Sequence, residues 1–309
     1  MMDWTDRHDR VFLRQFSQHT LLYTEMVTSA ALQHGDASYL LQHNAEEHPV
    51  ALQLGGSDPQ QLSRAAIAGA NAGFDEINLN VGCPSDRVQS GAFGACLMAD
   101  PPVVASCVKS MRDSVTLPVT VKCRIGIDDR DSEGELHDFI GTVADAGCDV
   151  FIVHARKAIL KGLSPKENRE IPPLNYERVF GLKYQFPQLS IVINGGITSL
   201  EQACSLLHKV DGVMLGREAY QNPYILHEVD SKIFHLPGLE KSRKEYLLQY
   251  IPYMQAEIQR GTPLRHMARH LMGLFKGQKG GKQFRRHLSE YCHQDNADVK
   301  TVLDALSFT

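Results

Sequence analysis

Seven short runs rich in β-branched and other apolar residues recur along the chain, and each is followed by a segment long enough for a helix. The runs occupy residues 21–26, 50–56, 76–82, 119–126, 149–155, 190–196 and 212–217. Regular alternation of strand and helix predicts a parallel sheet covered by helices. No G-x-G-x-x-G follows any of these strands. The pattern therefore favours an α/β fold of the (β/α)8 TIM-barrel type over a dinucleotide-binding sheet.

An eight-stranded barrel requires one strand more than these seven. Residues 6–18 are expected to form the first helix, and residues 1–5 are too few for a strand and its loop. Two explanations stay open: the encoded chain begins upstream of Met1, or the barrel has a gap beside its second strand. We expect the first, in which a truncated or mis-set start removes the first strand.

Two helices carry clear start signals. Residues 59–72 and 101–112 each begin with proline and are preceded by aspartate. An aspartate N-cap followed by proline at the first helical position is typical of a helix start. We therefore predict helices over both ranges.

The alternation ends after residue 230, and only helical patterns follow. We predict a TIM-barrel domain over residues 1–235 and a small all-helical domain over residues 236–309. The helices expected in the second domain cover residues 241–260, 262–275, 283–293 and 297–306, with a basic loop at 277–281.

Charge is distributed unevenly along the chain. The net charge is −4, which by itself indicates no nucleic-acid partner. Residues 258–289, however, contain no aspartate or glutamate. This acid-free stretch carries Arg260, Arg265, Arg269, Lys276, Lys279, Lys282, Arg285 and Arg286.

The remaining composition is that of an ordinary globular protein, with 43% hydrophobic and 22% charged residues. No run approaches the roughly 18 apolar residues that a membrane span requires. The seven cysteines form no C-x-x-C pair. We therefore expect a cytoplasmic protein with reduced thiols, no zinc or other metal site, no membrane contact and no obligate protein partner.

Polar residues stand at the carboxyl ends of five predicted strands. Alternate strand residues face opposite sides, and in a barrel the outward set is apolar because helices cover it. The last inward residue of each strand is then polar. These residues are Gln53, Asn80, Lys122, His154 and Asn194.

Each of the five has a plain structural alternative. His154 is explained equally well as a hydrogen-bonded core histidine, Lys122 as a snorkelling side chain, and the amides as loop caps. Five together are harder to explain in this way, because an unpaired polar group inside a barrel costs about 1–3 kcal/mol. Active sites of this fold lie at the carboxyl ends of the strands, so we predict a site there.

Two glycine-containing turns lie where such barrels commonly hold a phosphate. Asn194, Gly195 and Gly196 end one strand, and Gly216 and Arg217 end the next. Backbone N–H groups and an arginine fork suit a phosphate group, although glycine pairs also serve ordinary tight turns. Together the two turns favour a phosphate-bearing cofactor.

Cys83 lies between Gly82 and Pro84, directly after the strand at 76–82. An ordinary thiol is mostly protonated at neutral pH and can donate a proton. The other six cysteines are interpreted as inert, whereas Cys83, on a loop over the barrel mouth, is predicted to be functional.

The motifs carrying these residues closely resemble the flavin-dependent tRNA-dihydrouridine synthases, and among them the bacterial A-type enzymes. The resemblance spans almost the whole chain, and GLSPKENREIPPL looks like an A-type signature. The motifs are DEINLNVGCPSDRVQSGAFGACLM (75–98), VKCRIGIDD (121–129), HARKAILKGLSPKENREIPPL (154–174), INGGI (193–197) and GREAYQNP (216–223).

The resemblance implies FMN as cofactor, NADPH as reductant, and uridines 20 and 20a of the tRNA D loop as substrate. It implies that Cys83 protonates C5 of uracil while reduced flavin delivers hydride to C6. Asn80 and His154 are then placed to hydrogen-bond the uracil or the flavin. The implied FMN-contacting residues are Met1, Gln53, Lys122, His154, Asn194, Gly195, Gly196, Gly216 and Arg217. Family members carry a first strand that ends in an Ala-Pro-Met loop, and Met1 stands where that methionine would be.

A uridine in folded tRNA must be extruded to reach a barrel mouth, so the enzyme must also grip the surrounding backbone. We expect the helical domain and the long loop at 157–175 to do this. Taken singly, each basic residue is better explained as a solvated surface charge, but the acid-free stretch as a whole favours RNA binding. The predicted tRNA contacts are Lys166, Asn168, Arg169, Arg269, Lys279, Lys282, Arg285 and Arg286, with Asn80 at the uracil.

Two other functions stay open. The first is another FMN barrel oxidoreductase acting on a small free substrate, for which the basic helical segment has no use. The second is an RNA-binding or chaperone protein that has lost its flavin with the missing strand. A yellow protein preparation favours an enzyme, and a colourless one that stays so with added FMN favours the RNA-binding protein.

Overall fold

The computed structural model describes residues 1–85, 88–89, 91–237 and 241–309. Asp86, Arg87 and Ser90 of the motif at 75–98 lie outside the described residues.

Contacts divide the chain into two compact units. The barrel unit consists of Tyr23–His43 and His48–Leu215. The helical unit consists of Met1–Leu22, Asn44–Glu47 and Gly216–Thr309.

The seven predicted strands are confirmed, and they follow one another in a single sheet in chain order. Every pairing from β2 to β7 is parallel. β1 and β7 stand at the two ends of the strand order. The predicted TIM-barrel class with a helical segment after it is confirmed, with seven strands described. The strands are β1 (Leu22–Thr28), β2 (Val50–Gly55), β3 (Glu76–Asn80), β4 (Val119–Arg124), β5 (Val150–His154), β6 (Ser190–Asn194) and β7 (Gly212–Met214).

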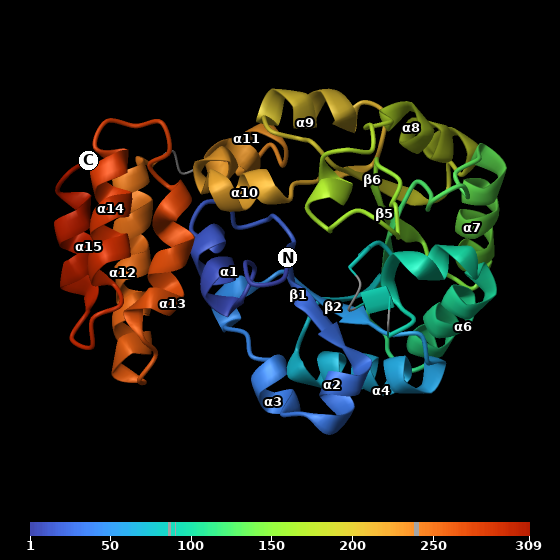
Figure 1. The fold of residues 1–309 in the computed structure, drawn as a ribbon, viewed down its shortest axis with the longest axis horizontal. Coiled ribbons are helices and arrows are strands. Elements are labelled where there is room, and N and C mark those ends of the chain that lie inside the picture. Colours follow the sequence, from blue (N-terminus) through green and yellow to red (C-terminus); the bar gives the residue numbers. More distant parts are fainter. Residues whose placement is uncertain (86–87, 90, 238–240) are drawn as a thin grey trace. The chain divides into compact units, whose positions relative to one another are not determined.

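Helices of the barrel unit surround the curled sheet (Figure 1). The predicted starts of α4 and α6 are confirmed, because Asp58 accepts a hydrogen bond from the Gln61 N–H at 2.7 Å and Asp100 one from the Val103 N–H at 3.4 Å. Among the described residues, the α-helices of this unit are α2 (Ser29–His34), α3 (Ala37–Leu40), α4 (Pro59–Ala72), α6 (Pro101–Arg112), α7 (Glu133–Asp145), α8 (Tyr176–Gln185) and α9 (Leu200–Leu207), and its 3-10 helices are Gly94–Ala99 and Glu167–Arg169.

The outward face of the strands packs against these helices, as the alternation predicts. Leu52 of β2 and Ile77 of β3 are fully buried. Gly69 of α4 lies directly over them, since a Cβ added to it would come within 2.6 Å of Leu52 Cδ2 and 2.8 Å of Ile77 Cδ1. The apolar core therefore lies between sheet and helices, which leaves the inward face for polar side chains.

The helical unit contains the helices predicted after residue 240. The range predicted as one helix at 262–275 is two shorter elements, α13 (Leu264–Ala268) and a 3-10 helix (Arg269–Gly273). The other α-helices described in this unit are α1 (Arg7–Arg14), α10 (Arg217–Gln221), α11 (Val229–Lys232), α12 (Arg243–Gln259), α14 (Gly281–Tyr291) and α15 (Val299–Leu306), and short 3-10 helices cover Ala45–Glu47 and Pro223–Glu228.

The beginning of the chain packs within the helical unit. The Trp4 and Tyr220 rings stack with centroids 4.6 Å apart, and the Tyr250 hydroxyl donates to the His8 carbonyl at 2.9 Å. The second of these contacts joins segments on the two sides of the boundary predicted between residues 235 and 236, which itself stays a prediction.

A buried ion pair anchors α1. Arg10 and Glu47 are both buried, with Arg10 Nε 2.6 Å from Glu47 Oε2. Replacing Glu47 with alanine is expected to lower the free energy of unfolding by about 3 kcal/mol, because it leaves a buried guanidinium without its carboxylate. Urea unfolding followed by circular dichroism measures this, with Glu46→Ala at the exposed neighbouring position as the matched control. Equal midpoints for the two variants would contradict the prediction.

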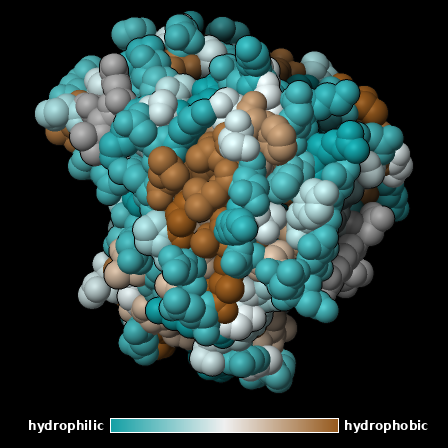
Figure 2. Space-filling model, turned by 90° about the vertical axis from the view of Figure 1, so that its left-hand side faces the viewer, coloured by the Kyte–Doolittle hydropathy of each residue, from teal (hydrophilic) through white to brown (hydrophobic). Residues whose placement is uncertain are grey.

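None of the helices in the described ranges is both long and apolar enough to cross a bilayer. Figure 2 shows a band of hydrophobic side chains in a mainly hydrophilic surface.

Candidate active site at the carboxyl ends of the strands

The strand register aligns the predicted polar residues. Asn80 of β3 pairs with Lys122 of β4, and His154 of β5 pairs with Asn194 of β6. Gln53 of β2 pairs with Asn78, two residues before Asn80. Paired residues of neighbouring parallel strands point to the same face, so all five predicted side chains face inward near the strand ends.

A chain of hydrogen bonds links the inward side chains of β2, β3 and β4. Asn80 Nδ2 donates to Gln53 Oε1 at 2.8 Å, and Gln53 Nε2 donates to Asn78 Oδ1 at 2.9 Å. Asn78 Nδ2 then donates to Thr120 Oγ1 at 2.8 Å, and Thr120 donates to Glu76 Oε1 at 2.6 Å. These hydrogen bonds therefore fix the Asn80 amide against polar side chains that lie further from the carboxyl ends of the strands.

Sequence reasoning placed no role on Asn78, Thr120 or Glu76. The signal was available, because Glu76, Asn78 and Asn80 alternate along one strand and share its inward face. The prediction considered only the last inward residue of each strand and so missed the layer beneath.

Lys122 and His154 lie in a cation-rich part of the ring. Burial and the neighbouring Arg124 lower the pKa of Lys122 to about 8. Burial, with Arg124, Lys122 and Arg156, holds the pKa of His154 well below its usual value, so this imidazole is neutral at pH 7. Lys122 Nζ contacts Asn194 Oδ1 at 3.3 Å. His154 Nδ1 is buried and has no hydrogen-bond partner among the described residues.

Arg124 is a further inward residue that the sequence analysis did not identify. It is buried and pairs in register with His154. Burial lowers the pKa of Arg124 to about 10; Cys83 opposes this effect, and Arg169 and Arg156 reinforce it. The sequence analysis took Lys122 as the last inward residue of its strand, although β4 extends to Arg124, which follows Lys122 by two positions and therefore shares its face.

The turn after β6 requires glycine. Gly195 has φ 116° and Gly196 has φ 69°, both in the left-handed region. A Cβ on Gly195 would lie 3.2 Å from His154 Nε2, so the backbone passes directly beside the imidazole. Asn194 donates to the Met214 carbonyl at 2.8 Å, which joins this turn to the neighbouring strand β7.

Cys83 lies on the loop after β3 and is half-buried. Its backbone N–H donates to Asn80 Oδ1 at 2.9 Å, and its carbonyl accepts from the Ala95 N–H at 2.9 Å. The thiol contacts the Ser85 hydroxyl at 3.5 Å. Through Asn80, the loop that carries this thiol is bonded directly to the polar ring.

The long loop at 157–175 carries three predicted RNA contacts with different environments. Lys166 is exposed and Arg169 half-buried. Asn168 is fully buried, and its side chain bonds the loop backbone, accepting from the Ile159 N–H at 2.7 Å and donating to the Leu163 carbonyl at 3.1 Å. The structure therefore gives Asn168 a role inside the loop rather than on its surface.

Other predicted site residues belong to the helical unit. Met1 Sδ is 3.9 Å from the position that a Cβ on Gly216 would occupy, so these two residues lie together. Arg217 is the first residue of α10. Arg269 forms an ion pair with Asp6. The remaining predicted RNA contacts, Lys279, Lys282, Arg285 and Arg286, are exposed or half-buried, and Arg286 Nε lies 2.7 Å from Glu290 Oε1.

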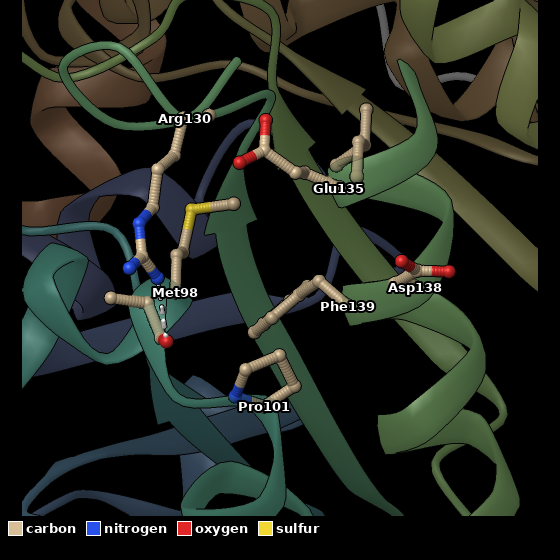
Figure 3. Close-up of a pocket in the computed structure, with 9 residues that line it drawn as sticks. Met98, Pro101, Arg130, Glu135, Asp138 and Phe139 are labelled. Carbon is tan, nitrogen blue, oxygen red and sulfur yellow. Dashed lines mark hydrogen bonds between the residues drawn. The ribbon is translucent and has the colours of Figure 1, made fainter. Parts of the chain in front are cut away.

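A cavity of about 160 Å³ is lined by residues other than the predicted site residues (Figure 3). It is lined by Met98, Pro101, Arg130, Glu135 and Phe139, among others, and Arg130 Nη1 donates to the Ala99 carbonyl at 3.0 Å beside it. None of its lining residues belongs to the polar ring.

Comparison with known proteins adds independent information. The sequence model described as "Dihydrouridine synthase (Dus)" matches residues 1–308. The chain is 56% identical over 308 residues to a protein of Vibrio cholerae, with 99% of this chain and 94% of the relative covered. It is 58% identical over 307 residues to one of Escherichia coli, with 99% and 89% covered. It is 57% identical over 302 residues to one of Shewanella oneidensis, with 98% and 90% covered. All three relatives are named tRNA-dihydrouridine(20/20a) synthase.

Proposed function

Because this chain belongs to the dihydrouridine synthase family, we propose that it reduces uridine to 5,6-dihydrouridine at positions 20 and 20a of the tRNA D loop, with FMN as cofactor and NADPH as reductant. One observation carries the proposal: the loop of Cys83 is bonded to a ring of polar strand ends, in a chain whose relatives are named for this activity. The site of action would be the cytoplasm.

The residues present fit a flavin. His154 Nδ1 is buried without a partner among the described residues, which suits a polar atom of a ligand. Lys122, Arg124 and Arg156 gather near this imidazole, and such a concentration of positive charge suits an electron-rich or anionic group. Gln53 of β2 and Asn194 of β6 contribute further amides on the inward face of the sheet.

On this basis Gln53, Lys122, His154, Asn194, Gly195 and Gly196 would hold FMN. The further assignment of Met1, Gly216 and Arg217 rests on the resemblance alone. When bound, FMN would supply the hydride that C6 of the uracil receives. Lys122 would stabilise negative charge that develops during this transfer, as fixed cations do in other active sites.

Cys83 would complete the reduction as a general acid. Its S–H bond breaks as the C5–H bond of uracil forms, and the resulting thiolate regains a proton from solvent. The two electrons that saturate the C5–C6 bond come from NADPH. Asn80 would hold the loop of Cys83 and contact the uracil edge, and neutral His154 would offer one donor and one acceptor.

The RNA would be held outside the ring. Lys166 and Arg169 on the long loop, together with Lys279, Lys282, Arg285 and Arg286, would neutralise phosphates. Arg269 would bind a phosphate only after its ion pair with Asp6 is broken. We propose residues 236–309 as the principal tRNA-binding part.

The function is tested by sequencing tRNA from a strain that lacks the gene and from the same strain carrying it. We expect dihydrouridine at positions 20 and 20a only when the gene is present. Identical tRNA modification in both strains, together with flavin-dependent reduction of a small enone, would instead support a small-molecule oxidoreductase. A colourless protein that takes up no FMN would support the RNA-binding alternative.

The lowered pKa of Lys122 predicts how FMN binding depends on pH. Below pH 8 the lysine is already protonated and the affinity is expected to be flat. Above pH 8 the free protein must take up a proton to present the cation, so the affinity is expected to fall by up to about tenfold per pH unit. Fluorescence titration of the apoprotein with FMN measures this. Lys122→Met should remove the dependence and Lys157→Met should retain it; a flat profile for the wild type would contradict the assignment.

A further inference from the structure

The guanidinium of Arg124 is bonded to three backbone carbonyls. Nε donates to the Gly82 carbonyl at 2.8 Å, and Nη1 donates to the carbonyls of Lys157 and Asn168, each at 3.2 Å. The residue is only 4% exposed. A buried cation is usually paired with a carboxylate. The hydrogen bonds of Arg124 described above go instead to backbone carbonyls of segments that are distant in sequence. We therefore interpret Arg124 as a residue that holds these segments in place.

One of these carbonyls belongs to the peptide that precedes Cys83. On the other side of that peptide, the Cys83 N–H donates to Asn80 Oδ1, which also accepts the Gly82 N–H at 3.0 Å. The peptide between Gly82 and Cys83 is thus held through its carbonyl by Arg124 and through its N–H by Asn80. Both holding side chains come from inward positions of neighbouring strands, β3 and β4.

The other two carbonyls belong to the long loop. Lys157 stands at its beginning, and Asn168 binds the loop to itself through its buried amide. Gln89 provides a second connection between the two loops, since its Nε2 donates to the carbonyls of Pro84 and Leu160, each at 2.9 Å. The loop of Cys83 and the loop that carries Lys166 and Arg169 are therefore connected by side chains at two places.

We propose that Arg124 is a positioning residue that sets the Cys83 thiol for proton transfer and couples its position to the long loop. This inference rests on the proposed function for the proton transfer, while the coupling of the loops does not. A displacement of a reacting group by about 1 Å can reduce a rate about 100-fold. A lysine at this position retains a positive charge but has one nitrogen, which cannot occupy the positions of both Nε and Nη1.

The first test is single-turnover oxidation of the reduced, FMN-loaded Arg124→Lys variant by unmodified tRNA. The maximal rate is expected to fall about 100-fold, with the half-saturating tRNA concentration and the rate of flavin reduction by NADPH close to those of the wild type. The matched control is Arg130→Lys. Arg130 lies just after β4 and also donates to a backbone carbonyl, that of Ala99, but it is exposed and lies at the cavity of Figure 3. The Arg130→Lys variant should therefore retain the wild-type maximal rate.

A double-mutant cycle shows whether Arg124 acts through Cys83. In the Cys83→Ala background, Arg124→Lys is expected to cause no further loss of rate, because the group that it positions is absent. Additive losses would mean that Arg124 acts on the flavin or the uridine itself, and would overturn the proposal. A wild-type rate for Arg124→Lys alone would also overturn it.

Hydrogen exchange provides a readout that needs no tRNA. In Arg124→Lys, exchange is expected to accelerate in both the segment containing Cys83 and the segment 157–168, while Arg130→Lys leaves both unchanged. Unchanged exchange in Arg124→Lys would overturn the coupling. If exchange accelerates as expected but wild-type enzyme fails to reduce tRNA, the proposed function fails and the structural coupling stands.

Discussion

Replacing Cys83 with alanine is expected to reduce dihydrouridine formation by about 100- to 10,000-fold, the usual contribution of a general acid. The variant should still bind FMN and accept hydride from NADPH, because among the described residues the thiol hydrogen-bonds to Ser85 alone and the loop is held through its backbone. Stopped-flow measurement separates the two half-reactions: flavin reduction should be normal and its reoxidation by tRNA slow.

The segment between β3 and α6 also provides a matched control for this substitution. Cys96 lies in its 3-10 helix (Gly94–Ala99), is also half-buried, and its thiol donates to the Phe93 carbonyl at 3.1 Å. Cys96→Ala should therefore reoxidise at the wild-type rate. Wild-type-like turnover of unmodified tRNA by Cys83→Ala would eliminate the acid role, whatever the control shows.

Reversing Arg285 and Arg286 to glutamate is expected to weaken tRNA binding about 100-fold at low salt. The salt dependence should also fall, by about one unit of slope for each phosphate that the variant no longer neutralises. Both residues lie on α14 within the acid-free stretch, where Lys282 and Lys279 precede them. Filter binding over a series of salt concentrations measures both quantities.

The helical unit also offers a control variant with the same change in net charge. Lys232 forms an (i, i+4) pair with Glu228 at 2.8 Å, much as Arg286 does with Glu290, and Lys300 is exposed on α15. The variant Lys232→Glu/Lys300→Glu changes net charge by the same amount outside the acid-free stretch, so it should retain a steep salt dependence. Equal losses of tRNA affinity in both double variants would indicate a general effect of net charge. The acid-free stretch would then have no specific role in tRNA binding.

The sequence predicts the framework of this protein well because the framework depends on local periodicity. Alternation along each strand places Gln53, Lys122 and His154 on the inward face, and the aspartate–proline pairs locate the starts of α4 and α6. These signals involve residues that are close in sequence. The polar composition of the inward face is equally local, so the candidate site could be located before its geometry was known.

The features that sequence reasoning missed depend on partners distant in the chain. Arg269 resembles a free phosphate ligand until its pair with Asp6, 263 positions away, is known. Asn168 looks like a surface amide, yet it is buried within its own loop. Arg124 was overlooked because strand ends are the least certain boundary, and its contacts to Gly82 and Asn168 cross two loops. Burial and pairing of polar side chains are tertiary properties that residue type alone does not determine.

The most direct test of the central claim is a single turnover with purified protein. FMN-loaded enzyme is reduced with one equivalent of NADPH and mixed with tRNA that contains no dihydrouridine, and flavin absorbance is followed while the product RNA is mapped. We expect the flavin to reoxidise in step with the appearance of dihydrouridine at positions 20 and 20a. Flavin that stays reduced in the presence of this tRNA, with every uridine intact, would contradict it.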